Sequence, residues 1–142
     1  MRKVKVKICG LKRAQDIECV NKLLPDYIGF VFAKTKREVT EQQAAQLKAM
    51  LNPQIKAVGV FVNAEIDLIV RLAASRTIDI IQLHGDEDAA YCERLRLQTE
   101  LPIIKAVRVK DAGSFENLQA YPCDYLLFDT YTKGSTAAPV SV

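Results

Sequence analysis

The sequence lacks the features that mark several classes of protein. It has no tryptophan, only 7% aromatic residues and a single histidine, and no basic segment is interleaved with the aromatic side chains on which nucleic-acid bases stack. No apolar run approaches the roughly 20 residues that span a bilayer. The basic N-terminus is not followed by the unbroken apolar stretch of a signal peptide. We therefore expect neither a nucleic-acid nor a membrane partner.

Cysteine pairs and phosphate-binding glycine motifs are missing as well. The four cysteines show no C-x-x-C pairing and no spacing typical of metal ligands, so we expect reduced thiols in a cytoplasmic protein. Neither G-x-G-x-x-G nor G-x-x-x-x-G-K-S/T follows any predicted strand, which disfavours a nucleotide-binding sheet. Of the four cysteines only Cys9 ends a predicted strand, and we interpret the other three as structural, namely Cys19, Cys92 and Cys123.

What the sequence does contain is a repeat of one strand and one helix. Apolar, strand-like segments recur about every 20 to 30 residues, and right-handed crossovers would lay them side by side and parallel. Periodicity alone leaves two architectures open, a doubly wound open sheet and an incomplete barrel, and both bind ligands at the carboxyl ends of the strands. The predicted strands are Val4–Cys9, Tyr27–Phe32, Ile55–Val62, Asp79–His84, Pro102–Val109 and Asp124–Asp129.

Five helices are expected between these strands. Thr40 and Gln43 have the spacing of a capping box at the start of the second helix. Asn63 is expected to cap the third helix, and Gly85-Asp86 to open a fourth that runs to about Leu97. The first and last helices are predicted at Asp16–Leu24 and Asp111–Ala120.

The basic residues near the N-terminus are spaced as in a strand. Lys3, Lys5 and Lys7 alternate with apolar residues, and the net charge of the chain is only +3. This alternation indicates a strand with a wet face rather than a surface for nucleic acid.

Two reactive residues close strands that are far apart in the sequence. Cys9 ends the first strand just before Gly10, where a helix N-terminus or a cation would favour the thiolate. Asp129 closes the apolar run Tyr125–Phe128, where loss of solvent favours a neutral, proton-donating carboxyl group. The structural alternatives are a buried cysteine and a loop aspartate that begins a turn. We hypothesise an acid/base pair, in which the thiolate removes a proton and the carboxyl group supplies one.

Other polar side chains lie at or just beyond the same ends of their strands. Gln82 and His84 are two residues apart, so both point to one face and suggest a ligand site at the mouth of the sheet. Arg37, in the loop after the second strand, could hold a carboxylate or phosphate by bidentate hydrogen bonds, and Arg108 is a candidate of the same kind. A hydrogen-bonded structural histidine and a solvated basic loop are the alternatives.

Five short motifs follow one another along the chain: Lys7-Ile8-Cys9-Gly10-Leu11, Gly29-Phe30-Val31-Phe32, Val58-Gly59-Val60-Phe61-Val62-Asn63, Gln82-Leu83-His84-Gly85 and Leu127-Phe128-Asp129. In this order and spacing they closely resemble the phosphoribosylanthranilate isomerase family, tryptophan-biosynthesis enzymes with a (β/α)8 TIM-barrel fold. The resemblance covers the chain from about Lys5 to Gly134. It implies an α/β fold in a single domain over residues 1–142, an incomplete barrel of about six parallel strands and five helices, with βα units seven and eight absent.

The resemblance also implies an activity. It is the Amadori rearrangement of N-(5-phosphoribosyl)anthranilate to 1-(2-carboxyphenylamino)-1-deoxyribulose 5-phosphate, with no metal or organic cofactor. Asp129 matches the family's general acid, which protonates the ribose ring oxygen and opens the ring to a Schiff base. Cys9 matches the general base, which removes the C2 proton to give an enolamine. Arg37 matches the arginine that holds the anthranilate carboxylate, and Gln82 and His84 match polar residues that line the pocket.

The end of the chain departs from the family pattern. Gly134-Ser135-Thr136-Ala137 keeps two members of a G-G-T-G loop, and the loops after strands seven and eight that grip the substrate phosphate are not present. The alternative is therefore a catalytically inactive, truncated fragment that needs a complementing chain. An unclosed sheet also leaves apolar edges on its first and sixth strands. We expect a homo-oligomer that pairs through these edges, or else marginal solubility.

Overall fold

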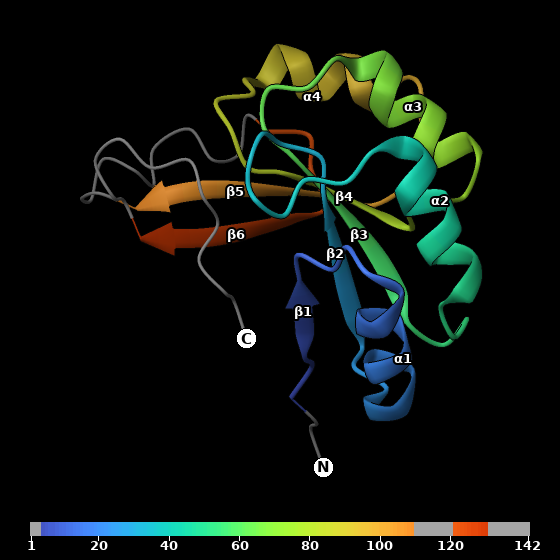
Figure 1. Ribbon diagram of the computed structural model, residues 1–142. Helices are drawn as coiled ribbons and strands as arrows, with labels where there is room; N and C mark the ends of the chain where they lie inside the picture. The colour runs from blue at the N-terminus through green and yellow to red at the C-terminus, as the bar shows by residue number, and fades with distance from the viewer. Residues whose placement is uncertain (1–3, 110–120, 131–142) are drawn as a thin grey trace.

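The computed structural model describes residues 4–109 and 121–130, which form one curved sheet covered by helices (Figure 1). All six strands are parallel and lie in chain order, so each strand pairs with the next one in the sequence. The strands are β1 (Lys7–Cys9), β2 (Tyr27–Val31), β3 (Lys56–Phe61), β4 (Ile80–Leu83), β5 (Ile103–Val109) and β6 (Tyr125–Thr130). The described helices are α1 (Ala14–Leu23), α2 (Glu41–Met50), α3 (Ile66–Ala74) and α4 (Ala89–Arg96).

The sheet is curled rather than flat. A cavity of about 450 Å³ is lined by side chains from all six strands, and the amine of Lys7 in β1 donates a hydrogen bond to Gln82 in β4. In a flat sheet these two strands would be three strand spacings apart, about 14 Å. With α1 to α4 along its outer side (Figure 1), the curled sheet forms a half-barrel. The structure thus confirms the barrel and not the doubly wound open sheet.

Two apolar clusters attach the helices to the outer face of the sheet. Ile28 and Phe30 of β2 are fully buried in the first cluster, and Ile81 and Leu83 of β4 are fully buried in the second. Successive strand residues point to opposite faces. The residues that lie between these apolar side chains, such as Gln82, therefore face the hollow of the half-barrel.

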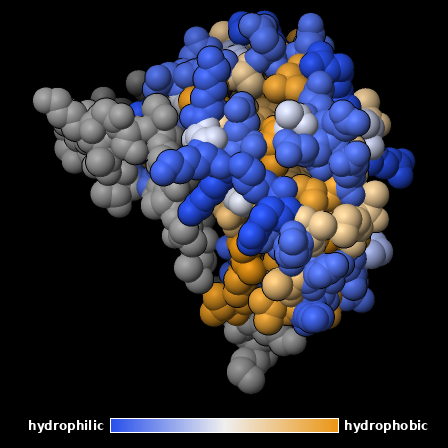
Figure 2. All heavy atoms as spheres, in the orientation of Figure 1, coloured by the Kyte–Doolittle hydropathy of each residue, from blue (hydrophilic) through white to orange (hydrophobic). Residues whose placement is uncertain are grey.

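The edges of the sheet carry exposed apolar side chains. Neither β1 nor β6 has a second neighbouring strand within the described part of the chain, and large apolar residues at or beside them are exposed, namely Val4, Val6, Tyr125 and Phe128. Figure 2 shows a largely hydrophilic surface over the helices, with hydrophobic residues gathered toward its lower part, where β1 and α1 lie. Pairing of these edges with another copy stays a prediction.

The predicted strands agree with the observed ones to within one residue at each end, with one exception. The first strand begins at Lys7 instead of Val4, because the amide of Val6 donates to the carboxylate of Asp26 rather than to a strand. The capping box of α2 is confirmed, since the Thr40 amide and the Gln43 amide each donate to the other residue's side chain, at 2.9 and 3.1 Å.

Two helix starts differ from the prediction. Asn63 does not cap α3, whose N-cap is Glu65; instead Asn63 has a φ of 50° and its side-chain oxygen accepts the Asp86 amide. The fourth helix starts at Ala89, because Asp88 provides the cap that Gly85-Asp86 was predicted to give. The helix predicted at Asp111–Ala120 lies outside the described residues.

An aspartate in front of every second strand fixes the register of the sheet. In each case the aspartate directly precedes a strand. Its carboxylate accepts a backbone amide at the start of the preceding strand, or one residue before that start, at 2.8 Å. An amide at a strand start has no ladder partner of its own, so the carboxylate satisfies it and aligns the two strands. The three pairs are Asp26 with Val6, Asp79 with Ala57, and Asp124 with Ile103.

We predict that Asp79→Ala lowers the free energy of unfolding by about 1–3 kcal/mol, because it removes a charged acceptor and leaves the Ala57 amide unsatisfied. Urea unfolding followed by circular dichroism measures this. Glu18→Ala, which removes an exposed carboxylate from α1, is the control and should stay within about 0.5 kcal/mol. Equal effects of the two substitutions would contradict the role of Asp79.

Candidate active site

The predicted site residues lie along one rim of the half-barrel. Cys9 is the last residue of β1, His84 directly follows β4, and Asp129 is the penultimate residue of β6. Because the six strands are parallel and paired without interruption, their carboxyl ends form a single edge. The curl of the sheet turns residues from both ends of the chain toward the same hollow.

A glycine makes room for the thiol of Cys9. Cys9 pairs with Gly29 across β1 and β2, and a Cβ atom at position 29 would lie only 2.7 Å from Cys9 Sγ. The half-buried thiol therefore occupies the space that a side chain at position 29 would fill.

Arg37 packs over the residue that follows Cys9. Gly10 has a φ of 86°, a left-handed conformation that favours glycine, and a Cβ atom there would collide with Cδ of Arg37. Arg37 is exposed, and within residues 4–109 and 121–130 its guanidinium has no hydrogen-bond or ion-pair partner. An unpaired guanidinium beside the end of β1 suits a carboxylate or phosphate of a ligand.

Gln82, His84 and Asp129 form a buried chain of hydrogen-bonding groups. Gln82 Nε2 lies 2.9 Å from His84 Nδ1, and His84 Nε2 lies 3.0 Å from Asp129 Oδ2. None of the three residues is more than 7% exposed. The shared face predicted for Gln82 and His84 is confirmed. Contact of either residue with a substrate stays a prediction.

Asp129 keeps one carboxylate oxygen without a partner. Its Oδ1 atom is buried and has no hydrogen bond within the described part of the chain. Buried polar atoms in folded proteins almost always have a partner. An unmatched oxygen at the rim therefore marks a position for a donor group of a ligand, or for a proton.

Lys7 also belongs to this site, although its sequence pattern did not predict it. Lys7 faces the hollow, two residues before Cys9 on the same face of β1, and its amine donates to Gln82 Oε1. Burial lowers the pKa of the Lys7 amine, and the charge of a Cys9 thiolate acts in the opposite direction. The wet face predicted from alternation is wrong for Lys7, because the curl turns this residue into the half-barrel. The sequence held one indication of this position, since residues two apart on a strand, such as Lys7 and Cys9, point to the same face.

A second buried network holds the loop that follows His84. Lys105 of β5 pairs with Glu87 at 3.0 Å and donates to the Gly85 carbonyl at 2.8 Å. Glu87 also accepts the amides of Gly85 and Asn63, at 2.9 and 2.8 Å. Because each buried charge has several partners, the network fixes this loop against β3 and β5.

Arg108, a further candidate for anion binding, is already paired. Its guanidinium lies 2.6 Å from the carboxylate of Asp86 in the loop after β4. This ion pair leaves Arg37 as the rim arginine that is open to a ligand.

The remaining cysteines differ from Cys9. Burial raises the pKa of Cys92 to about 11 and also raises that of Cys123, so both are thiols at neutral pH. Cys19 is exposed on α1. The surroundings of Cys92 and Cys123 agree with the structural interpretation, whereas the exposed thiol of Cys19 has no such packing role.

The described residues contain no group of three or more His, Cys, Asp or Glu side chains that could hold a metal ion. Among the described helices, none has the length and apolar character needed to cross a membrane.

A half-barrel of parallel strands, with polar and reactive side chains at the carboxyl ends of the strands, places the protein in the (β/α)8 fold class. The particular family follows from comparison with known proteins. The chain belongs to the family described as N-(5'phosphoribosyl)anthranilate (PRA) isomerase, whose model matches residues 6–138.

Named relatives and solved structures agree with this family. The chain is 48% identical over 132 residues to the N-(5'-phosphoribosyl)anthranilate isomerase of Lachnoclostridium phytofermentans, covering 93% of this chain and 61% of the relative. The enzyme of Endomicrobium trichonymphae is 48% identical over 128 residues, covering 90% and 62%. The crystal structure of the Thermotoga maritima isomerase superposes with a TM-score of 0.79 at 31% identity, covering 98% of this chain and 67% of that one. The chain thus spans about three fifths of the length of the curated relatives it matches.

We predict that Gly29→Ala displaces the Cys9 thiol from the sheet. The added methyl group should lower the free energy of unfolding by about 1–3 kcal/mol, a typical cost of overpacking, and should raise the rate at which Cys9 is alkylated. Peptide mass spectrometry measures that rate relative to the rate at exposed Cys19.

Gly59→Ala is the matched control, since a Cβ atom there would crowd Phe61 at 2.9 Å on the outer side of the sheet. It should cost similar stability and leave alkylation of Cys9 unchanged. An unchanged Cys9 rate in Gly29→Ala would contradict the position given to the thiol.

Proposed function

We propose that this chain carries the chemistry of its family, the Amadori rearrangement of N-(5-phosphoribosyl)anthranilate to 1-(2-carboxyphenylamino)-1-deoxyribulose 5-phosphate. The observation that carries the proposal is the buried carboxylate of Asp129, which has one unpartnered oxygen on the rim that also holds Cys9. A proton donor and a thiol at one edge of a hollow are what this isomerisation requires.

In the first step Asp129 acts as the general acid. Its carboxyl group gives a proton from Oδ1 to the ribose ring oxygen, and the C1–O bond breaks as the nitrogen lone pair forms a Schiff base. The resulting carboxylate keeps the hydrogen bond of its Oδ2 atom to His84, which stabilises the charge that the step creates.

In the second step Cys9 acts as the general base. Its thiolate removes the proton from C2 of the Schiff base, giving an enolamine that tautomerises to the ketose. The amine of Lys7 interacts favourably with a negative charge on this sulfur. The space above Gly29 gives the sulfur its position on the hollow side of β1.

Substrate orientation is assigned to Arg37. Its guanidinium, unpaired within the described residues, can hold the anthranilate carboxylate by two parallel hydrogen bonds. Gln82 and His84 line the same hollow. A phosphoribosyl anthranilate isomerase with a TM-score of 0.76 to this chain was solved in complex with reduced 1-(o-carboxyphenylamino)-1-deoxyribulose 5-phosphate. We propose that the rim of this chain binds the same compound.

We propose three further properties of the protein. They are one domain over residues 1–142, association of copies through the edges of the sheet, and a cytoplasmic location. The comparisons name the same isomerase throughout and do not favour the inactive fragment.

We predict that the purified chain consumes N-(5-phosphoribosyl)anthranilate, and that Cys9→Ser and Asp129→Asn each lower kcat by about 10²–10⁴-fold, as expected for loss of a general base or acid. Loss of substrate fluorescence measures turnover. Cys19→Ser and Asp67→Asn change an exposed thiol and an exposed carboxylate and should leave kcat unchanged. No turnover by the chain, or turnover that neither site substitution affects, would refute the proposal.

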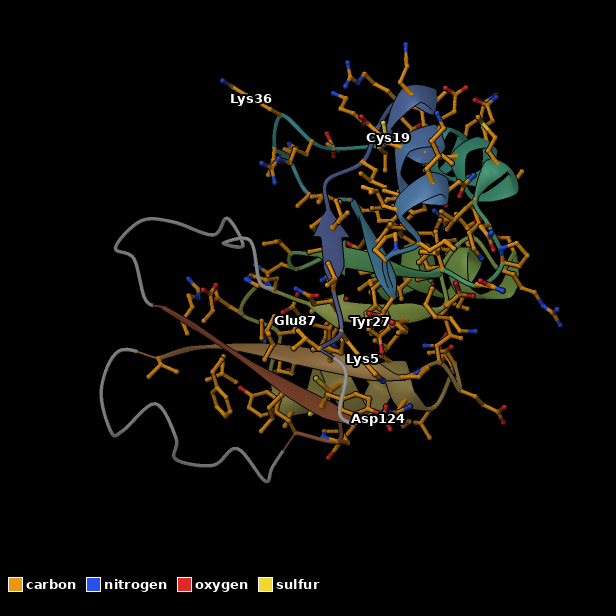
Figure 3. All side chains as sticks on the ribbon, turned by 90° about the horizontal axis from the view of Figure 1, so that it is seen from below. Lys5, Cys19, Tyr27, Lys36, Glu87 and Asp124 are labelled. Carbon is orange, nitrogen blue, oxygen red and sulfur yellow. The ribbon has the colours of Figure 1, made fainter. Side chains whose placement is uncertain are left out.

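We also predict that Arg37→Gln raises KM by about 10- to 100-fold, the loss expected for a charge-assisted bidentate contact. Steady-state kinetics measures the change. Lys36→Gln is the control, because Lys36 extends outward from the same loop (Figure 3). A similar KM for the two variants would show that the loop contributes only diffuse positive charge.

A further inference from the structure

A chain of hydrogen bonds links Lys7 to Asp129 through two other side chains, and in each bond the donor and the acceptor are fixed. Four side chains at β1, β4 and β6 form this unbroken hydrogen-bond chain: Lys7 contacts Gln82, Gln82 contacts His84, and His84 contacts Asp129. The amide, the imidazole and the carboxyl group in this hydrogen-bond chain can each serve as donor or acceptor toward a given neighbour, depending on orientation, tautomer or protonation. The protonated amine of Lys7 can only donate, because it has three donors and no acceptor.

That one-way donor sets the orientation of the Gln82 amide. Lys7 must face the carbonyl oxygen of Gln82, so the amide nitrogen Nε2 is the atom turned to His84. An amide nitrogen only donates. His84 Nδ1 must therefore accept, which means that it carries no proton.

The orientation of Gln82 in turn sets the tautomer of His84. With Nδ1 as acceptor, a neutral imidazole carries its proton on Nε2. This N–H group lies 3.0 Å from Asp129 Oδ2 and donates to it. Asp129 Oδ2 is thereby occupied as an acceptor and cannot hold a proton directed at the histidine.

We propose that Lys7 is a positioning residue which, through Gln82 and His84, confines the proton of Asp129 to Oδ1. Oδ1 is the buried oxygen that has no partner among the described residues, so the confined proton is the one a ligand can take. The use of this proton in acid catalysis rests on the proposed function. The location of the proton on Oδ1 rests only on the hydrogen bonds described above.

The proton balance of the step follows directly. The O–H bond at Asp129 Oδ1 breaks, an O–H bond forms at the substrate oxygen, and His84 keeps its Nε2–H bond throughout. Had the proton been on Oδ2, it would point at a histidine nitrogen instead of the substrate. The hydrogen-bond chain from Lys7 therefore favours the form of Asp129 that is protonated on Oδ1 over the form that is protonated on Oδ2.

Burial lowers the pKa of the Lys7 amine, because desolvation disfavours its charged form. The hydrogen bond to the carbonyl oxygen of Gln82 partly offsets this loss of solvent. The other titratable groups on this face are Cys9 on β1 and Arg108 on β5, which is paired with Asp86. Lys5 and the phenols of Tyr27 and Tyr125 line the same cavity as Lys7. None of these groups belongs to the hydrogen-bond chain from Lys7 to Asp129.

The chain offers a direct test, because His84 is its only histidine. In protein labelled with ¹⁵N, long-range ¹H–¹⁵N NMR spectra report which ring nitrogen carries the proton, without assignment of the spectrum. A charged Asp129 would itself favour the Nε2–H tautomer. The test therefore uses Asp129→Asn, in which a neutral amide replaces the carboxylate and leaves Lys7 and Gln82 as the directing groups.

In Asp129→Asn we expect the Nε2–H tautomer to predominate by at least about tenfold. Adding Lys7→Met frees the Gln82 amide to rotate, and the tautomer ratio should fall by about tenfold, equivalent to about 1.4 kcal/mol. Adding Lys5→Met instead should leave the ratio unchanged, because Lys5 precedes β1 and its amine donates to the hydroxyl of Tyr27 and not to Gln82 (Figure 3). Absence of a tautomer preference in Asp129→Asn, or no effect of Lys7→Met, would overturn the proposal.

A second variant keeps the test decisive if loss of the lysine unfolds the chain. Gln82→Glu in the Asp129→Asn background is nearly isosteric and offers the histidine only an acceptor. We expect Nδ1 of His84 to gain a proton in this variant. An Nδ1 atom that stays unprotonated would show that residue 82 does not direct the tautomer.

The tautomer measurement needs no turnover, so its outcome is separate from that of the isomerase assay. If the chain is active, Lys7→Met should lower kcat with little change in KM, while Lys5→Met should change neither. A changed KM alone would indicate that Lys7 binds substrate directly, and would contradict its role as a positioning residue.

Discussion

A chain of hydrogen bonds that crosses the hollow of the half-barrel ties its site together. It runs from Lys7 in β1 through Gln82 in β4 and His84 to Asp129 in β6, and so connects both edges of the sheet to its middle. The curl of the sheet makes these contacts possible, because flat strands would hold the first two residues about 14 Å apart. The same curl turns the Cys9 thiol toward the hollow above Gly29. Fold and candidate site are therefore consequences of one geometric constraint.

Much of the fold could be predicted because strand and helix periods are local properties. Apolar runs such as Tyr27–Val31 locate buried parallel strands, and the capping box at Thr40 fixes a helix start from four residues alone. The prediction failed where a side chain had a distant partner. Asn63 is an acceptable cap by composition, yet it accepts an amide from the loop after β4. The aspartates before β2, β4 and β6 satisfy amides 20 or more residues away, which no local pattern reveals.

The sequence could predict most residues that lie at the candidate site, but not the hydrogen bonds that link them. Strand ends and the period of two place Cys9, Gln82, His84 and Asp129 on one rim, since these depend on the strand assignment alone. The links between them depend on how far the sheet curls, which the sequence does not state. Lys7 therefore seemed to face water, although it is the group that orients the others.

The central claim is that Cys9 and Asp129 face one ligand at the rim, with Arg37 at its other end. A crystal structure of the chain with reduced 1-(o-carboxyphenylamino)-1-deoxyribulose 5-phosphate tests it most directly. We expect the ligand's carboxylate on the guanidinium of Arg37 and its sugar chain between Cys9 Sγ and Asp129 Oδ1, within hydrogen-bonding reach of both. A ligand bound elsewhere, or one whose sugar reaches only one of the two side chains, would contradict it.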